Sequence, residues 1–491
     1  MLFNSIDFGV FLPCVFILYW FVFNKNLNSQ NILLVLASYI FYAWWDWRFL
    51  SLIIFSTTVD YFVGNKLNVE TNVLKRKFLL WTSILVNLGF LGFFKYYNFF
   101  LESFNNAFSF FGIDFNTNTL NIILPVGISF YTFQTLSYTI DIYRKKLSAS
   151  NDFIAFSAFV SFFPQLVAGP IERATNLLPQ FLNPRKFNYS KAVDGTKQIL
   201  WGLFKKIVIA DNCGEFANQI FSNYTQLDGS TLTLGVFFFS FQIYGDFSGY
   251  SDIAIGTSRL FGFNLKQNFA TPYFSRNILE FWKRWHISLT SWLTDYVFTP
   301  LAIDLRHLEK WGITIAIFIT FFLSGLWHGA SWTFIFWGLL HGLYYLLTIL
   351  MIGHKTSKKV VAYNRSLPSI KELFSIFITF TLVSFSYIFF RAEDLNFAFE
   401  YINEIFSSSF YNIPQLNYLL TSPLTLSIEL TFILIIFLLI IEWIGRRELY
   451  ALEKFCNTNF FKRNLFYVLL IVLIFVFGNF EAALEFIYFQ F

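Results

Sequence analysis

The centre of the longest uncharged part of the chain reads Phe322-Leu323-Ser324-Gly325-Leu326-Trp327-His328-Gly329-Ala330-Ser331-Trp332. The 44 residues between Lys310 and Lys355 include no Asp, Glu, Lys or Arg. Since about 20 apolar residues cross a bilayer as a helix, this part is long enough for two membrane-spanning helices. An imidazole in such a helix is costly in hydrocarbon, so His328 is a candidate functional residue. The alternative is a histidine that hydrogen-bonds between packed helices.

The composition of the whole chain predicts a polytopic, all-α membrane protein. Of its 491 residues, 56% are hydrophobic and only 13% are charged, whereas a typical soluble domain has about a quarter charged residues. The three cysteines, Cys14, Cys213 and Cys456, lie far apart in the sequence, so a disulfide framework or metal site has no support. The modest net charge of +5 comes from basic loops beside apolar runs, which is typical of membrane topology rather than nucleic-acid binding.

Uncharged runs along the chain predict about 10–12 transmembrane helices, with additional re-entrant or interfacial helices, in a single membrane domain over residues 1–491. The run 153–171 has two interpretations. If it crosses the membrane, the basic stretch from Arg173 to Lys206 lies on the outside, against the usual charge bias. If it is re-entrant, Pro164, Gly169 and Pro170 would break it where protein or a water-filled cavity covers the backbone.

The distribution of basic residues predicts the orientation of the C-terminal half. The loops 352–371 and 443–463 are rich in Lys and Arg, while 391–421 contains Arg391 and four acidic residues. We therefore expect the two basic loops in the cytoplasm, and 391–421 and both termini outside it. The N-terminus lacks the basic region of a removable signal peptide.

The region from Phe241 to Asp304 is unlike a plain membrane-spanning helix, because aromatic residues alternate with charges of both signs. An amphipathic helix at the membrane surface would explain Lys283 and Arg284. It explains Asp246 and Asp252 poorly, since both lie in an otherwise apolar run.

The motif Phe281-Trp282-Lys283-Arg284-Trp285-His286-Ile287-Ser288-Leu289, with Trp327-His328-Gly329 42 residues after His286, resembles the membrane-bound O-acyltransferase (MBOAT) family. Within it, the bacterial alginate O-acetylation branch is the most similar. Further segments that resemble this branch are residues 1–5, 125–130, 163–170, 244–250 and 389–392.

The resemblance implies a helical fold around a central tunnel that crosses the bilayer, with an acyl donor entering from the cytoplasm and an acceptor hydroxyl from the other side. It identifies His328 with the catalytic histidine of the family and His286 with the second histidine of the bacterial members. An imidazole can act as the general base that removes the acceptor proton, and His286 would position the acceptor or stabilise the oxyanion. The residues expected to line the tunnel or site are Trp285, Trp327, Asp246, Asp252, Ser324 and Trp332.

The donor implied by the resemblance is acetyl-CoA or another acyl thioester, bound as a substrate rather than as a tight cofactor. Lys283 and Arg284, with Lys205 and Lys206 as further candidates, would attract its phosphates. Anchoring of these residues at the cytoplasmic surface explains them equally well. We interpret His341 as a packing residue, and His307 and His354 as solvated.

The function predicted from these features is O-acetylation of an exported cell-envelope polysaccharide, such as alginate or peptidoglycan. The enzyme would lie in the bacterial cytoplasmic (inner) membrane and pass the acyl group to a separate periplasmic acetyltransferase. One alternative is D-alanyl transfer to teichoic acid. The other is a transporter or exporter, which the absence of an internal sequence repeat disfavours.

Overall fold

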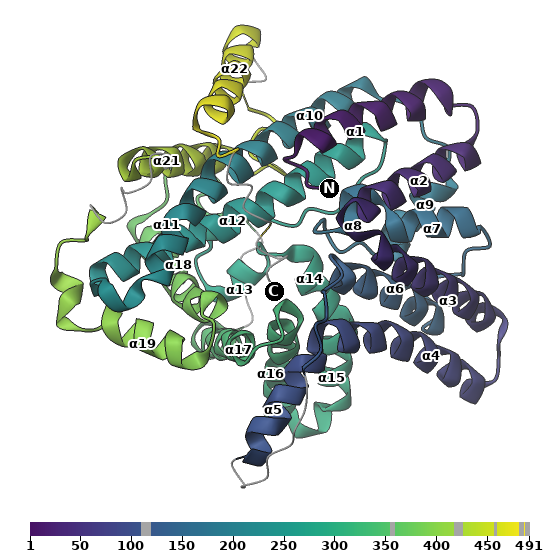
Figure 1. Ribbon diagram of the computed structural model, residues 1–491, viewed down its shortest axis with the longest axis horizontal. Helices are drawn as coiled ribbons and strands as arrows, with labels where there is room; N and C mark the ends of the chain where they lie inside the picture. The colour runs from purple at the N-terminus through teal and green to yellow at the C-terminus, as the bar shows by residue number, and fades with distance from the viewer. Residues whose placement is uncertain (110–118, 354–358, 417–425, 456–458, 481–485, 487–491) are drawn as a thin grey trace. The chain divides into compact units, whose positions relative to one another are not determined.

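The computed structural model of the protein describes residues 1–109, 119–353, 359–416, 426–455, 459–480 and 486. In these residues every regular element is a helix (Figure 1), which confirms the predicted all-α class. The chain forms two compact units, one of residues 1–192 and 257–266, the other of residues 193–256 and 267–491. The single domain over 1–491 stays a prediction. Cys456, His354 and the C-terminal residues 481–485 and 487–491 lie outside the described residues.

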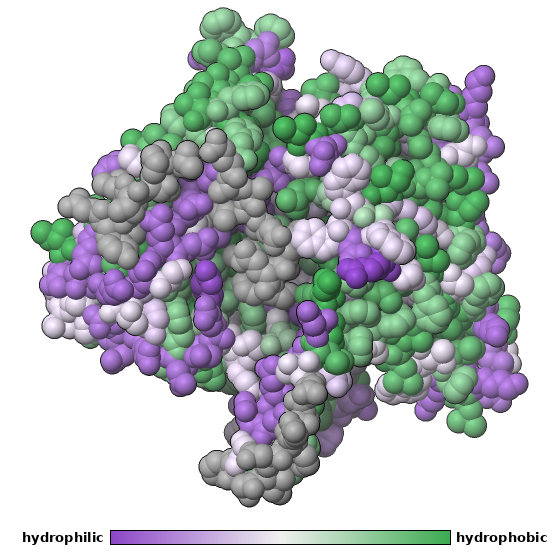
Figure 2. All heavy atoms as spheres, viewed as in Figure 1, coloured by the Kyte–Doolittle hydropathy of each residue, from purple (hydrophilic) through white to green (hydrophobic). Residues whose placement is uncertain are grey.

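Membrane-spanning character is evident in the helices themselves. Six helical segments of the described chain are long and apolar enough to cross a membrane, and Ile6–Val22 is a shorter apolar one. On α22 (Phe460–Phe477) large apolar side chains such as Phe475 lie exposed, which suits a lipid environment. Figure 2 shows hydrophobic residues over much of one face of the protein. The protein is therefore a multi-pass membrane protein, and the count of 10–12 crossings stays a prediction. The six segments are Val73–Ser109, Arg306–His328, Trp332–Ile352, Ile370–Arg391, Ile428–Gly445 and Phe460–Phe477.

The first unit packs three of its helices, α3, α4 and α6, side by side (Figure 1). The buried carboxylate of Asp60 is satisfied within the bundle, because it accepts hydrogen bonds from Ser83 Oγ at 2.5 Å and Asn87 Nδ2 at 2.8 Å. The helices of this unit are α1 (Ile6–Ile17), α2 (Leu27–Asp46), α3 (Leu50–Val69), α4 (Val73–Leu91), α5 (Tyr97–Ser109), α6 (Ile128–Tyr143), α7 (Phe153–Ser161), α8 (Phe163–Leu166) and α9 (Ala174–Leu182).

The ambiguous run 153–171 is broken in the structure. Helix α7 is 9 residues long, and after Phe162 the 4-residue α8 follows. At about 1.5 Å per residue, α7 spans less than half of the roughly 30 Å hydrocarbon core. This segment is therefore not one continuous membrane-crossing helix, as the re-entrant interpretation expected.

The second unit contains the region with the two candidate histidines. Its longest helix, α12, has 32 residues and includes the polar motif around Asp246. Its helices are α10 (Tyr189–Leu203), η4 (a π-helix, Phe204–Ala210), α11 (Asp211–Ser222), α12 (Gly229–Leu260, ending in the first unit), α13 (Ile278–Trp282), α14 (Ile287–Leu293), η7 (Thr294–Phe298), α15 (Thr299–Asp304), α16 (Glu309–His328), α17 (Trp332–Ile352), α18 (Ile370–Arg391), α19 (Leu395–Ile405), α21 (Ile428–Gly445) and α22.

Helices α16 and α17 form a tight hairpin, visible in Figure 1. Small residues make the close approach possible: a Cβ added to Gly325 would collide with the carbonyl oxygen of Phe334, and one added to Gly338 with that of Phe321. The side chain of Ser331 caps the start of α17 by accepting a hydrogen bond from the Thr333 amide. The hairpin thus fixes the end of α16, where His328 is the last residue.

Candidate functional site

His328 is enclosed by aromatic rings. Only 3% of its surface is exposed. Its ring centroid lies 5.0 Å from that of Trp327, 5.0 Å from that of Trp337 and 5.2 Å from that of Phe390. The side chain therefore faces the protein interior rather than lipid.

His286 is the residue directly before α14 and has an unusual backbone. Its φ of 44° and ψ of 54° lie in the left-handed region, which few residues other than glycine adopt. The imidazole is 1% exposed and lies 4.6 Å, between ring centroids, from Phe247 of α12. Its centroid is 5.7 Å from that of Trp327, whose ring also contacts His328. The structure thus brings the two histidines together around one indole.

A short backbone pairing holds the turn before His286. The amide of Ala270 donates to the carbonyl of Arg284 at 3.0 Å, and the amide of Ile287 donates to the carbonyl of Asn268 at 2.9 Å. Residues 268–270 therefore lie alongside residues 284–287, and the Asn268 side chain reaches His286, with Oδ1 3.1 Å from Nδ1.

The two basic residues of the Trp-Lys-Arg-Trp motif differ in their surroundings. The Arg284 guanidinium pairs with Glu280 at 2.9 Å and also donates to the carbonyl of Ala270 at 3.3 Å. Arg276 pairs with the same carboxylate at 2.9 Å. Arg284 therefore supports the turn through contacts with protein groups, and its assignment to donor phosphates stays a prediction. Lys283 is exposed.

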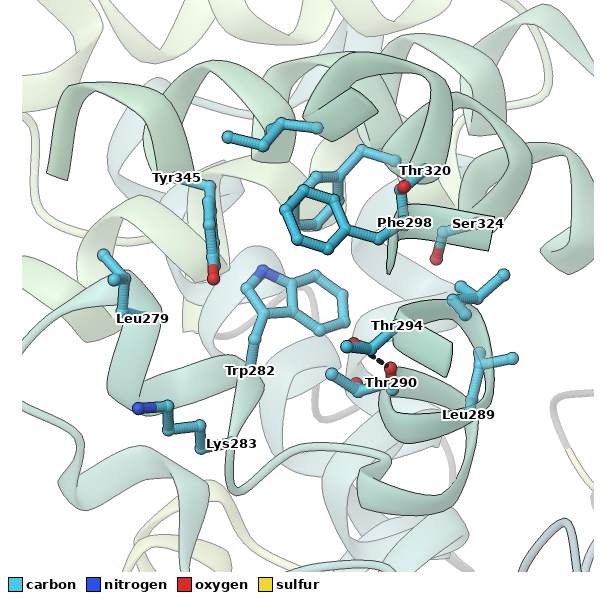
Figure 3. A pocket seen from close by; sticks show the side chains of 13 residues that line it. Leu279, Trp282, Lys283, Leu289, Thr290, Thr294, Phe298, Thr320, Ser324 and Tyr345 are labelled. Carbon is cyan, nitrogen blue, oxygen red and sulfur yellow. Dashed lines mark hydrogen bonds between the residues drawn. The ribbon is translucent and has the colours of Figure 1, made fainter. Parts of the chain in front are cut away.

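A cavity of about 250 Å³ lies beside the motif (Figure 3). Its walls are mostly apolar. Of the polar residues that line it, Thr294 donates its hydroxyl hydrogen bond to the carbonyl of Thr290 at 2.7 Å. Lys283 and Ser324 both line it, and Ser324 is one helical turn before His328. Among the described residues that line this cavity neither histidine is included. The lining residues are Leu279, Trp282, Lys283, Leu289, Thr290, Leu293, Thr294, Phe298, Ile317, Thr320, Phe321, Ser324 and Tyr345.

Asp246 and Asp252 form ion pairs with lysines of the π-helix η4. Lys206 Nζ lies 2.8 Å from Asp246 and 2.8 Å from Asp211, and Lys205 Nζ lies 2.7 Å from Asp252. Both lysines are buried. The carboxylates thus pair with cations inside the unit. The residue of α12 that contacts the His286 ring is Phe247, next to Asp246.

The remaining predicted residues divide between the interior and the surface. Trp285 is buried and stacks on Phe281 with ring centroids 5.5 Å apart. Trp332 is 54% exposed at the start of α17, so it lies outside the buried aromatic shell, and its assignment as a site-lining residue stays a prediction. His341 is buried with Nε2 2.8 Å from Ser386 Oγ, as a packing histidine would be.

Sequence reasoning missed Asn268, which contacts His286 from a segment without a motif. Its side chain is fully buried, a rare state for Asn that no local pattern indicated. No cluster of three or more potential metal ligands is present in the part of the chain that the structure describes. The two buried imidazoles suit proton transfer, and the apolar cavity lined by Lys283 suits a chain-like substrate.

Comparison with known proteins gives these features a family. The sequence model of the MBOAT, membrane-bound O-acyltransferase family matches residues 144–390, which include both histidines. The chain is 38% identical over 425 residues to the protein named "Probable alginate O-acetylase AlgI" of Pseudomonas aeruginosa, covering 85% of this chain and 77% of that one. It is 36% identical over 428 residues to the "Peptidoglycan O-acetyltransferase" of Helicobacter pylori, covering 81% and 78%.

A more distant similarity links the chain to the "Teichoic acid D-alanyltransferase" of Bacillus subtilis. The identity is 30% over 285 residues, which is 56% of this chain and 70% of that protein. From the family match and the long alignments together, the chain belongs to the membrane-bound O-acyltransferase family and is a multi-pass membrane O-acyltransferase.

Proposed function

We propose that this enzyme takes an acetyl group from a cytoplasmic thioester and moves it across the bacterial inner membrane for O-acetylation of an exported cell-envelope polysaccharide. The observation that carries this proposal is the similarity over most of the chain to proteins named for alginate and peptidoglycan O-acetylation. The similarity to the D-alanyltransferase covers a smaller part, so acetyl is favoured over D-alanyl. Membership of an acyltransferase family leaves the transporter hypothesis without support.

His328 acts as the general base in this proposal. The acceptor oxygen bonds to the thioester carbonyl carbon, and the bond from that carbon to sulfur breaks. The hydroxyl proton passes to the imidazole and from there to the leaving thiolate, so the imidazole returns to its neutral form. Its enclosure by Trp327, Trp337 and Phe390 supports this role, because these rings exclude water that would hydrolyse the thioester.

The cavity beside the motif is our candidate for the arm of the donor. Its apolar walls suit a thioester chain, and Lys283 at its lining supplies a positive charge for phosphate groups of acetyl-CoA. Ser324, one turn from His328, lines the same cavity, which would bring the chain toward the base. A separate periplasmic acetyltransferase that receives the acyl group completes the proposal.

Turnover by the purified protein tests the proposed donor. The protein is reconstituted in liposomes and supplied on one side with acetyl-CoA labelled in its acetyl group, or with a D-alanyl thioester. We expect release of free thiol and appearance of label on a hydroxyl acceptor only with the acetyl thioester. Turnover of the D-alanyl thioester alone would reject acetyl transfer in favour of the teichoic-acid alternative.

A further inference from the structure

We propose that Asn268 is a positioning residue that fixes His286 as the tautomer with a proton on Nδ1, so that Nε2 accepts the hydrogen bond of the acceptor hydroxyl. The inference rests on the proposed function only in placing His286 at the site of acyl transfer. Its structural basis is a set of hydrogen bonds between residues that are all buried: Ser251, Asn268, His286 and Ser288.

The orientation of the Asn268 side-chain amide follows from its hydrogen bonds. The backbone N–H of Ser288 points to Asn268 Oδ1 at 3.3 Å. Because a backbone N–H can only donate, the atom facing it is the oxygen and not the nitrogen of the amide. The Asn268 nitrogen in turn donates to Ser251 Oγ at 3.1 Å, and Ser288 Oγ donates to Oδ1 at 2.8 Å. The amide is thus held at both ends.

The tautomer of His286 follows from the same amide oxygen. Its Nδ1 lies 3.1 Å from the same amide oxygen. Since that oxygen only accepts, Nδ1 must carry the proton that the hydrogen bond requires. A neutral imidazole has one such proton, so Nε2 presents a lone pair. This nitrogen is buried and has no hydrogen-bond partner among the described residues.

The backbone supports the same conclusion. His286 is held in the left-handed region with φ 44°, a conformation that persists only when the surroundings enforce it and that often occurs at functional sites. The enforcing contacts are the hydrogen bonds of residues 268–270 with residues 284–287. The segment that fixes the tautomer of His286 therefore also fixes the direction of its ring.

This geometry decides between the two roles considered for His286. Stabilising an oxyanion requires a hydrogen-bond donor, whereas Nε2 of the Nδ1-protonated ring is an acceptor. His286 is therefore suited to orienting the acceptor by accepting its O–H hydrogen bond. Proton removal by His328 and acceptor orientation by His286 become separate tasks around the shared Trp327 indole.

Nitrogen NMR of the full-length protein in membranes tests the inference without relying on activity. The chain has only five histidines, so ¹⁵N-histidine labelling gives few signals, and the signal lost in His286→Gln identifies His286. We expect a protonated Nδ1 and an unprotonated Nε2 at neutral pH in the wild type. In Asn268→Ala the proton should redistribute between the two nitrogens.

Two further variants keep the test decisive. Asn268→Asp preserves the shape and provides a carboxylate, so His286 should become doubly protonated and the pH profile of acyl transfer should shift to higher pH. Asn277→Ala removes another Asn side chain, which caps α13, and should leave the tautomer unchanged. A wild-type His286 with the proton on Nε2, or the same tautomer in Asn268→Ala, would overturn the inference. The expected tautomer in a protein without acyl turnover would instead reject the proposed function alone.

Discussion

Two groups of largely buried polar side chains in the second unit offset the free-energy cost of burial in different ways. In the charged cluster of Lys205, Lys206, Asp211, Asp246 and Asp252, two lysines form ion pairs with three aspartates, with N–O distances of 2.7 to 2.8 Å. The histidine pair, His286 and His328, is surrounded mainly by aromatic rings. Burial of a polar group therefore does not by itself mark a reaction site.

The difference lies in what each group would lose. In the charged cluster, removal of Lys206 leaves Asp211 and Asp246 buried without the cation that they share, which costs stability. In the histidine pair, removal of an imidazole deletes a proton acceptor but no ion pair among those described. We therefore expect the cluster to determine folding and the pair to determine chemistry.

The largest expected effect concerns His328→Ala. Loss of the general base should lower the rate of acyl transfer by about 10²–10⁴-fold while the protein remains inserted and folded. His341→Ala is the matched control, because His341 lies in the same uncharged stretch and is bonded to Ser386. Steady-state turnover of acetyl-CoA, normalised to folded protein, measures both variants. Equal losses in the two variants would remove His328 from the mechanism.

The next effect concerns the stability of the charged cluster. Lys206→Met keeps a similar side-chain length but leaves Asp211 and Asp246 buried without their shared cation. We expect a destabilisation of about 3–5 kcal/mol, measured as a lower unfolding midpoint by tryptophan fluorescence. Lys191→Met removes an exposed lysine and should leave the midpoint unchanged. An unaltered midpoint in Lys206→Met would contradict a structural role for the cluster.

A smaller effect concerns donor binding at the cavity. Lys283 is exposed, and a solvent-screened contact with phosphate contributes up to about 1 kcal/mol. Lys283→Gln should therefore raise the KM for acetyl-CoA by up to about fivefold with kcat unchanged, and added salt should reduce the difference. Lys310→Gln, at another exposed lysine, serves as the control. A fall in kcat without a change in KM would exclude Lys283 from donor binding.

The smallest effect concerns Trp332. Because 54% of its surface is exposed, Trp332→Ala should change stability by no more than about 0.5 kcal/mol and leave turnover intact. Trp327→Ala, at the buried indole between the histidines, should by contrast impair both. Thermal unfolding measures the stability of the two variants, and acetyl-CoA turnover measures their activity. A loss of turnover in Trp332→Ala would show that this residue takes part in the site despite its exposure.

The sequence predicted the fold class and the burial of His328, because both follow from local composition, whereas His286 was identified only by the family resemblance. An uncharged stretch of 44 residues can fold only as membrane helices, and a histidine within it is forced into the interior. The Pro and Gly residues of 153–171 also predicted that this run is broken. Only the ends of α7 and α8 show that it is not one continuous helix.

Long-range pairings could not be predicted in the same way. Asp252 lies 47 residues from Lys205 in the sequence, and no local pattern indicates which basic residue neutralises it. Trp332 lies four residues after His328 in the sequence, but whether its side chain is buried depends on which face of α17 is exposed. Arg284 has the charge that a phosphate site needs, and only its distance to Glu280 reveals that this charge is already paired.

The most direct test of the separation between stability and chemistry compares Lys206→Met with His328→Ala in one experiment. Unfolding midpoint and acetyl-CoA turnover per folded molecule are measured on the same preparations. We expect Lys206→Met to lower the midpoint while its folded molecules turn over within a few-fold of wild type. We expect His328→Ala to keep the midpoint and to lose at least about 10²-fold in turnover. Contradiction would come from a loss of both properties together in each variant, or from turnover near wild type in His328→Ala.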